Sequence, residues 1–338
     1  MGIKNLNRFL LNNCSKEAIH KIHLEELKNR TVVVDTSIYM YKFIAENALL
    51  ENTYLLISLF KKYDIHGIFI FDGKPPAEKH DLLKDRQQKK RAAEHQYKEL
   101  LAALMKTTDD DDDAAAAKKR EIELEMNVLK KQFIRLKDRE IDTVKQLMDA
   151  YNVEYHESNG EADELCAAFV KTAKAWACIT DDMDMFIYDC PYIIRNMSLL
   201  NHTAHIYDKQ TILKELEMTP KQFQEIIILS GTDYNIHSKT SLHETIKWFY
   251  EYKKYILNTS TTCTNKPILE FYVWLVKHTK YINDFHELLN TYKMFITNNI
   301  QIENIVTHDT KHTITTSKYE MHIDKMKSIM GLAGFIFL

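Results

Sequence analysis

The sequence predicts an α/β fold with a mostly parallel central sheet flanked by helices, and three observations support this. Apolar runs at residues 31–35, 68–72 and 176–180 each end in, or are closely followed by, an acidic residue. Continuous apolar runs of this length are typical of strands buried on both faces of a parallel sheet. Helix-like segments at residues 38–62 and 161–174 lie between these runs. Alternating strands and helices favour a sheet that is covered on both sides.

Residues 77–150 have a different composition, because they contain neither Pro nor Gly and are rich in Lys, Glu, Gln, Ala and Leu. Such a composition favours long, exposed helices. Five aspartates, Asp109–Asp113, interrupt the segment. Their mutual repulsion predicts a solvated tip that joins two helices rather than a metal site.

The rest of the chain is predicted to be mainly helical. Residues 218–257 look helical, with further helix-like stretches near 267–278 and 284–296 and a strand-like patch near 311–316. We expect a core over residues 1–257. Residues 258–338 form a mostly helical region to which the sequence assigns no role.

Bulk properties exclude several classes of protein. The 338 residues are 45% hydrophobic and carry a net charge of -3. No run reaches the roughly 18 apolar residues of a membrane span, and no signal-peptide core begins the chain. We expect a monomer in the nucleus or cytoplasm, with five scattered cysteines in the reduced state. Nucleic-acid binding would require a local basic face, since the average charge is slightly negative.

Acidic residues follow the predicted strands. The carboxyl ends of parallel strands share one edge, so Asp35, Asp72 and the pair Asp182 and Asp184 should converge there. An extended backbone would direct both members of the pair to the same side. Clustered carboxylates repel one another, and hard oxygen ligands suit Mg²⁺ or Mn²⁺. Each aspartate alone could equally be a helix cap or a turn residue.

Three more acids lie at predicted helix ends. Glu161 and Asp163 occupy a probable helix start, where they could simply compensate the helix dipole. Asp233 follows another apolar run and would pass as a helix cap.

Together these segments resemble the motifs of the flap endonuclease/XPG family, in the same order and spacing over roughly residues 1–250. The resemblance rests on Gly2–Leu6, Val33–Ser37, Phe71–Pro76, Gly160–Asp163, Asp182–Asp184 and Gly231–Tyr234. It implies a PIN-like core in which these acids surround two Mg²⁺ or Mn²⁺ ions. The implied ligands are Asp35, Asp72, Glu161, Asp163, Asp182, Asp184 and Asp233. Asp163 departs from the family, which often has Glu there.

The resemblance also assigns roles to basic residues. Lys79 and Arg86 would lie over the scissile phosphate, and the two helices of residues 77–150 would form an arch that admits a single-stranded 5′ end. From pattern alone these residues could be a solvated helix face, and Tyr41 could be core packing rather than a base-stacking residue. The implied DNA contacts are Tyr41, Lys89, Lys90, Lys130, Lys131, Arg135 and Lys239.

One segment departs from the family. Relatives carry a Gly-rich hairpin that grips duplex DNA with a monovalent cation, whereas residues 235–241 contain no glycine. We therefore expect a degenerate helix-two-turn-helix over about 226–257 and doubt the cation site. The sequence also shows no clear sliding-clamp motif. Few Gly and Pro with many Ile, Lys and Asn suggest an AT-rich source, such as a large DNA virus.

The expected function is a structure-specific 5′ nuclease that cuts 5′-flap or branched DNA in replication or repair, with replication proteins as possible partners. Two alternatives stay open. One is a 5′ exonuclease or a junction or bubble nuclease of the same family. The other is a catalytically inactive scaffold that binds nucleic acid.

Overall fold

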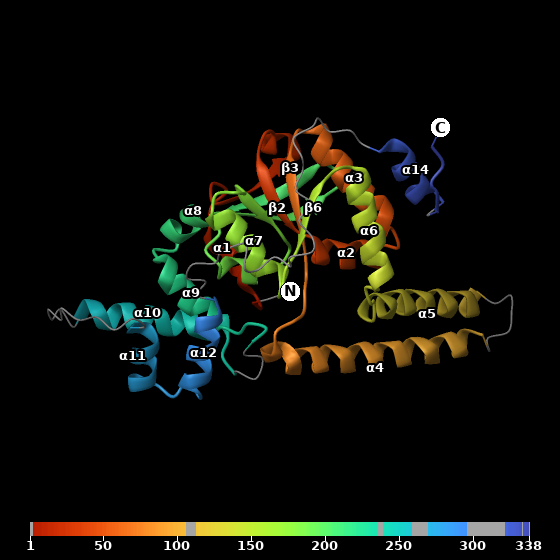
Figure 1. Ribbon diagram of the computed structural model, residues 1–338. Helices are drawn as coiled ribbons and strands as arrows, with labels where there is room; N and C mark the ends of the chain where they lie inside the picture. Colours follow the sequence, from red (N-terminus) through yellow and green to blue (C-terminus); the bar gives the residue numbers. More distant parts are fainter. Residues whose placement is uncertain are drawn as a thin grey trace.

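A seven-stranded sheet with helices on both faces forms the centre of the molecule (Figure 1). The computed structural model describes residues 3–105, 113–234, 239–258, 270–295, 322–332 and 334–337. The strand order is β1-β7-β6-β5-β2-β3-β4. The strands are β1 (Ile19–His23), β2 (Thr31–Asp35), β3 (His66–Phe71), β4 (Glu154–Glu157), β5 (Ala177–Ile179), β6 (Tyr192–Ser198) and β7 (Thr203–Asp208).

The sheet is mostly parallel, which confirms the predicted fold class. Strands β6, β5, β2, β3 and β4 run parallel to one another, while β7 pairs antiparallel with both β6 and β1. Strand order reverses between β2 and β5, because the chain builds first to one side of β2 and then to the other. Ligand sites in such sheets lie at the carboxyl ends of the strands beside this reversal.

Both faces of the central strands are buried, which explains their continuous apolar runs. Val33 packs into one hydrophobic cluster, while Val32 and Val34 pack into another on the opposite face. The first cluster includes side chains of α1 (Leu6–Asn13), α7 (Ala162–Lys171), α8 (Lys209–Glu215) and α9 (Pro220–Leu229). The second includes side chains of α2 (Thr36–Ala45), α3 (Leu49–Lys62), α6 (Asp138–Ala150) and α14 (Ile323–Leu332).

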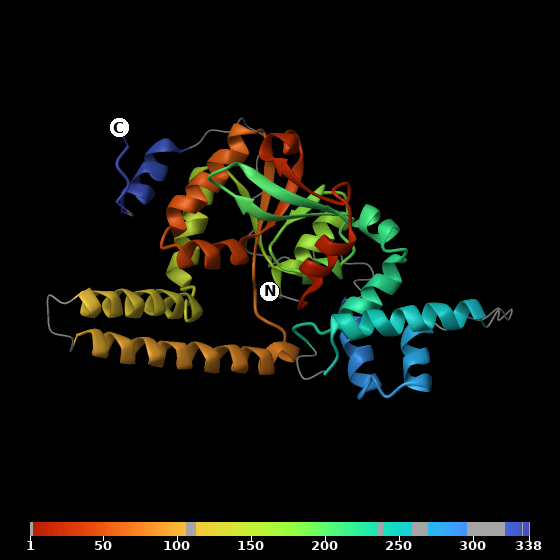
Figure 2. The ribbon, with the colours of Figure 1, turned by 180° about the vertical axis from the view of Figure 1, so that it is seen from behind.

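The described residues between 77 and 150 form a short 3-10 helix, η2 (Ala77–Lys79), and three α-helices, so the prediction of two helices was wrong. Helices α4 (His80–Leu104) and α5 (Asp113–Gln132) lie side by side and extend away from the sheet (Figures 1 and 2). Ala93, Met126 and Leu129 are buried in this pair, which we call the arch hairpin. The third helix, α6, is part of the core, because its Val144, Leu147 and Met148 are buried in the second cluster. Most of the aspartate tip lies outside the described residues.

Other boundaries also differ from the predictions. Residues 38–62 contain two helices, α2 and α3, separated at Glu46–Ala48. The strands β1, β4, β6 and β7 were not predicted, because they mix polar and apolar residues or are very short. The strand-like patch at 311–316 lies outside the described residues, as does Cys263. The other four cysteines are free thiols.

The helices of the C-terminal part pack against two different regions of the core. Helices α10 (Leu242–Asn258), α11 (Glu270–His278) and α12 (Phe285–Phe295) extend the first hydrophobic cluster beyond α9. Helix α14 instead lies on the other side of the molecule, near α6 and α3 (Figure 1). There the backbone N–H of His322 donates to the carbonyl of Ala150, 2.8 Å away, at the last residue of α6. Among the described helices, none has the length and apolar character needed to cross a membrane.

We expect Met330→Ala to lower the free energy of unfolding by about 2–4 kcal/mol, because the side chain is fully buried in the second cluster and its loss leaves a cavity. The same change at Leu332, which is 90% exposed on the same helix, should stay within about 0.5 kcal/mol. Urea unfolding of both variants measures the difference. Equal effects at the two positions would show that α14 does not pack as described.

Candidate active site

An acidic cleft lies between the carboxyl edge of the sheet and the base of the arch hairpin. Its volume is about 760 Å³. Six of the predicted acids line it, and the seventh, Asp184, is buried at 4% exposure. The structure therefore brings together acids from β2, β3 and the segments around β5 and α7, as the sequence predicted. The lining acids are Asp35, Asp72, Glu161, Asp163, Asp182 and Asp233.

Two of these acids are held by helix N-termini. Asp35 ends β2 and caps α2, since its Oδ1 accepts from the amide of Ile38 at 3.4 Å. Its Oδ2 accepts from the hydroxyl of Thr180, which follows β5, at 2.9 Å. Asp72 follows β3, and its Oδ1 accepts from the amide of Ala162 at 2.8 Å, at the start of α7. Capping and a place in the cleft are thus compatible, so neither interpretation of these acids excludes the other.

The backbone at Asp182 and Asp184 is not extended, contrary to the prediction. Met183 has helical dihedral angles, and Asp184 begins a short 3-10 helix, η3 (Asp184–Phe186). The amide of Asp184 donates to Oδ1 of Asp182 at 3.1 Å, so a tight turn rather than an extended strand keeps the two acids close. Among the described residues, Oδ1 of Asp184 has no hydrogen-bond partner although it is buried.

The cleft disfavours negative charge on its deepest acids. Burial, followed by repulsion from Asp72, raises the pKa of Asp35 to about 8. Burial also raises the pKa of Asp163 well above its usual value, with repulsion from Asp35 and Asp182 adding to the effect. Burial, followed by repulsion from Asp182 and Asp233, also raises the pKa of Asp184 well above its usual value. Positive charge brought into the cleft would stabilise all of these carboxylates.

Lys79 and Arg86 supply part of that positive charge. The Nζ of Lys79 lies 2.6 Å from Oε1 of Glu161 and 3.6 Å from Oδ2 of Asp233. Burial, the largest single influence, lowers the pKa of Lys79, but the hydrogen bond and charge of Glu161 together with the charges of Asp233 and Asp163 raise the pKa overall. Arg86 on α4 lies 2.7 Å from the same oxygen of Asp233. Both predicted cations therefore face the cleft, where they contact acids directly.

Basic side chains line the same cleft as the acids, and we call Lys90, Lys131 and Arg135 its basic wall. Of the predicted DNA contacts, Tyr41, Lys90, Lys131 and Arg135 line the cleft. The Nζ of Lys90 lies 5.4 Å from the ring centre of Tyr41, which is 39% exposed. Three other predicted contacts, Lys89, Lys130 and Lys239, are exposed but lie outside the cleft lining.

Sequence reasoning missed several residues of the cleft. Lys84 lines it on α4, and Thr180 bonds to Asp35. Tyr234 donates from its hydroxyl to Oε2 of Glu161 at 2.5 Å. Thr180 directly follows β5, so its place at the carboxyl edge was available as a signal. Tyr234 belongs to the Gly231–Tyr234 motif, but nothing in the sequence indicates which acid it contacts.

The donor set fits divalent cations by its chemistry. All of the acids present hard oxygen atoms, the ligands of Mg²⁺ and Mn²⁺, and the buried Oδ1 of Asp184 lacks a partner among the described residues. Yet no three acidic, His or Cys side chains of the described part of the chain are already grouped as ligands of one ion. Glu161 and Asp233 are engaged by Lys79 and Arg86, and Asp72 caps α7. Cation binding would replace some of these contacts with contacts to the metal ion.

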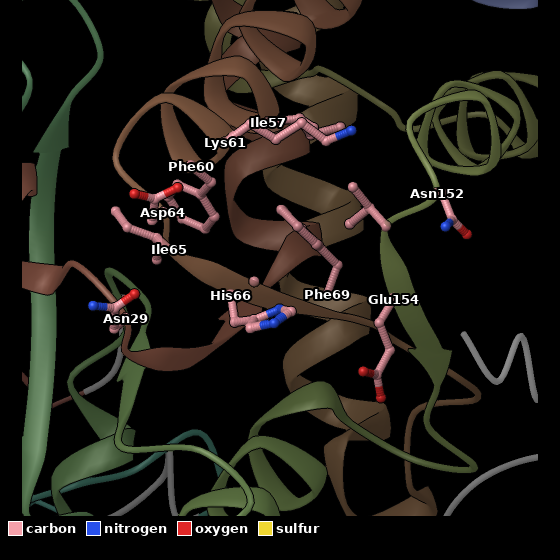
Figure 3. A pocket seen from close by; sticks show the side chains of 12 residues that line it. Asn29, Ile57, Phe60, Lys61, Asp64, Ile65, His66, Phe69, Asn152 and Glu154 are labelled. Carbon is pink, nitrogen blue, oxygen red and sulfur yellow. The ribbon is translucent and has the colours of Figure 1, made fainter. Parts of the chain in front are cut away.

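A second cavity, of about 650 Å³, lies at the opposite edge of the sheet (Figure 3). Phe60 and Phe69 contribute to its apolar surface, and its polar lining residues include Asn29, Asp64 and Asn152. Each of these three has positive φ, between 50° and 59°, at a turn that leads toward β2, β3 or β4. Asn and Asp tolerate this conformation better than most residues, so chain reversal explains their presence.

We expect Gly73→Ala to lower stability by about 1–3 kcal/mol and to impair the site, because the loop after Asp72 has no room for a side chain. A Cβ at Gly73 would lie 1.9 Å from the carbonyl oxygen of Ser158. The amide of Gly73 also donates to the carbonyl of Gly160 at 2.7 Å. Gly160→Ala is the matched control, since a Cβ there meets nothing within 4 Å. Thermal unfolding compares the two, and equal tolerance would contradict the close approach.

The fold and the site together define a PIN-like α/β protein with an acidic cleft under a helical hairpin. Models of the XPG N-terminal domain and the XPG I-region match residues 1–93 and 152–233, together just over half of the chain. The chain therefore belongs to the XPG nuclease family.

Individual relatives agree with this assignment. Flap endonuclease 1 of Methanococcus aeolicus is 28% identical over 233 residues, which cover 64% of this chain and 66% of the relative. A probable RAD2-like endonuclease of Invertebrate iridescent virus 3 is 25% identical over 356 residues, covering 86% of this chain and 93% of the relative. The archaeal match thus spans slightly less than two thirds of that protein.

A solved structure shares the fold. The catalytic core of Rad2 in complex with DNA substrate has a TM-score of 0.62 at 20% identity, and the match covers 98% of this chain and 94% of that one.

Proposed function

We propose that this protein is a divalent-metal-dependent, structure-specific nuclease that cuts branched or 5′-flap DNA by phosphodiester hydrolysis. The observation that carries the proposal is the separation of charge in one cleft. Carboxylates gather at the sheet edge, while Lys84, Arg86, Lys90, Lys131 and Arg135 line the same cleft. Binding a phosphate backbone requires the cations, and holding the metal ions that assist hydrolysis requires the acids.

The acids would hold two Mg²⁺ or Mn²⁺ ions. When bound, such ions activate water and stabilise the oxygens that attack and leave. Asp35 and Asp72 are fixed by helix N-termini and would present ligands from β2 and β3. Asp182 and Asp184 would present them from the turn after β5. The raised pKa values of Asp35, Asp163 and Asp184 indicate where added positive charge is most stabilising.

Lys79 and Arg86 would orient the scissile phosphate. Both reach the edge of the acid cluster, so a phosphate drawn into the cleft can replace Glu161 or Asp233 as their partner. Tyr41 offers a partly exposed ring beside Lys90, on which a base can stack. The described cleft lies beside the arch hairpin, so a single strand entering it would run along α4.

A substrate panel tests the proposal. Purified protein is incubated with labelled 5′-flap, nicked, bubble and blunt duplex DNA in Mg²⁺, and again with excess EDTA. We expect cleavage near the flap junction that leaves a 5′-phosphate and stops completely when the metal is removed. Preferred cleavage of the bubble or of duplex ends would instead assign a junction-type or exonuclease activity.

Binding measured in parallel separates the remaining alternative. A scaffold would bind the flap substrate without cutting any member of the panel. That outcome would overturn the proposal, as would cleavage that continues unchanged in EDTA.

A further inference from the structure

Tyr234 contacts one acid and one cation of the cleft. Its hydroxyl donates to Oε2 of Glu161 at 2.5 Å, while Oε1 of the same carboxylate lies 2.6 Å from Nζ of Lys79. That Nζ also lies 4.7 Å from the centre of the Tyr234 ring. One side chain thus contacts Glu161 through its hydroxyl and Lys79 through its ring face.

These contacts restrict the two charged groups. A carboxylate with a different donor on each oxygen cannot rotate without losing one of them. The ammonium group of Lys79 is confined between Glu161 and an aromatic face, and its side chain is only 9% exposed. Charge-assisted hydrogen bonds and cation–π contacts both strengthen when water is excluded.

The ring of Tyr234 is itself supported from the C-terminal part of the chain. It meets Phe295, the last residue of α12, edge-on, with ring centres 5.3 Å apart. Phe295 is 2% exposed and meets Tyr188 at the same distance on another side. Helix α12 therefore packs directly behind the residue that touches the acidic cleft.

We propose that Tyr234 is a positioning residue of the nuclease site, which fixes Glu161 with its hydroxyl and Lys79 with its ring, and that Phe295 of α12 holds the ring in place. This assignment rests on the proposed function. It gives α12 a role that the sequence did not indicate, because this helix would set the geometry of the cleft without contacting DNA or metal.

The test separates the hydroxyl from the ring. Tyr234→Phe removes only the bond to Glu161, whereas Tyr234→Leu also removes the face beneath Lys79, and Phe295→Leu removes the supporting edge. Tyr155→Phe is the matched control, because that hydroxyl donates to Asp149 at 3.2 Å outside the cleft. Each full-length variant is assayed for single-turnover cleavage, Mn²⁺ binding, flap binding in Ca²⁺ and thermal unfolding.

We expect Tyr234→Phe to weaken Mn²⁺ binding and slow cleavage by about tenfold each, the usual scale for removing a residue that orients a metal ligand. Flap affinity and the unfolding midpoint should match those of the Tyr155→Phe control. Phe295→Leu should show the same pattern with smaller effects. Tyr234→Leu should slow cleavage further, and this extra loss should shrink in a Lys79→Ala background, since the ring acts through Lys79.

Two outcomes would overturn the inference. One is Tyr234→Phe behaving like the control in both Mn²⁺ binding and cleavage. The other is a loss of cleavage that follows the loss of thermal stability across all variants. Failure of the proposed function looks different: the unaltered protein would cut none of the DNA substrates. Weakened Mn²⁺ binding in Tyr234→Phe would support the positioning role even then.

Discussion

Asp182→Ala is expected to reduce flap cleavage by at least about 10³-fold while DNA binding persists. Asp182 lines the cleft and raises the pKa of Asp35, Asp163 and Asp184 by repulsion, so it lies at the centre of the acid cluster. Losing a ligand to catalytic metal removes several kcal/mol of transition-state stabilisation, and each 1.4 kcal/mol or so is a factor of ten in rate. Binding should survive, because the basic wall is untouched. Single-turnover rates and flap affinity in Ca²⁺ measure the two quantities.

The adjacent acid provides the control. Asp181 accepts from the amide of Asn196 at 2.7 Å and does not line the cleft. Asp181→Asn keeps an acceptor there and should retain nearly full activity. A rate for Asp182→Ala close to that of Asp181→Asn would refute the assignment of the metal site.

Lys79→Ala is expected to slow cleavage by about 10²–10³-fold, the cost of removing one positioned charge from a transition state. Lys79 is buried, contacts Glu161 and lies within 4 Å of Asp233, so neighbouring groups hold its charge at the cleft. Arg86→Ala should cost less, because Arg86 is 41% exposed and has only Asp233 as a described partner. The loss should appear in the single-turnover rate more than in substrate affinity.

Lys98→Ala is the control for charge alone. Lys98 lies on the same helical hairpin, is 68% exposed and pairs with Glu94 away from the acids. Its removal should change the rate by less than about twofold, since exposed ion pairs contribute little. Equal slowing by Lys79→Ala and Lys98→Ala would mean that both lysines act through general electrostatic attraction of DNA, and that Lys79 has no positioned role at the scissile phosphate.

The sequence was informative about the fold where residues are buried on both sides. The runs around Val33, Phe69 and Cys178 predicted β2, β3 and β5 because a parallel central strand cannot alternate. It was uninformative at β6 and β7, where polar residues such as Arg195 and His205 interrupt the pattern. The sequence analysis also assigned α6 to the arch. Composition alone does not reveal that Val144 and Leu147 pack into the second hydrophobic cluster of the core.

The site was predictable in its acids and less so in its contacts. Strand ends share an edge by topology, so Asp35, Asp72 and Asp182 could be placed together without coordinates. Which partner each acid takes depends on side-chain packing between elements far apart in sequence. The Glu161–Lys79–Tyr234 cluster joins three such elements, and no local pattern specifies it. The turn at Met183 was likewise invisible, since extended and turned backbones both bring Asp182 and Asp184 together.

Because α14 packs on α6, the helical layer behind the arch hairpin is held together by contacts between residues far apart in the sequence. Its other members, α2, α3 and α6, are synthesised long before residues 322–337, so their apolar side chains lack this partner until late in synthesis. Chains with many contacts between residues far apart in sequence fold slowly, and they expose aggregation-prone hydrophobic surface until those contacts form. We therefore expect this layer to be the last part of the core to form, and its completion to limit how fast newly made protein acquires a rigid base for the hairpin.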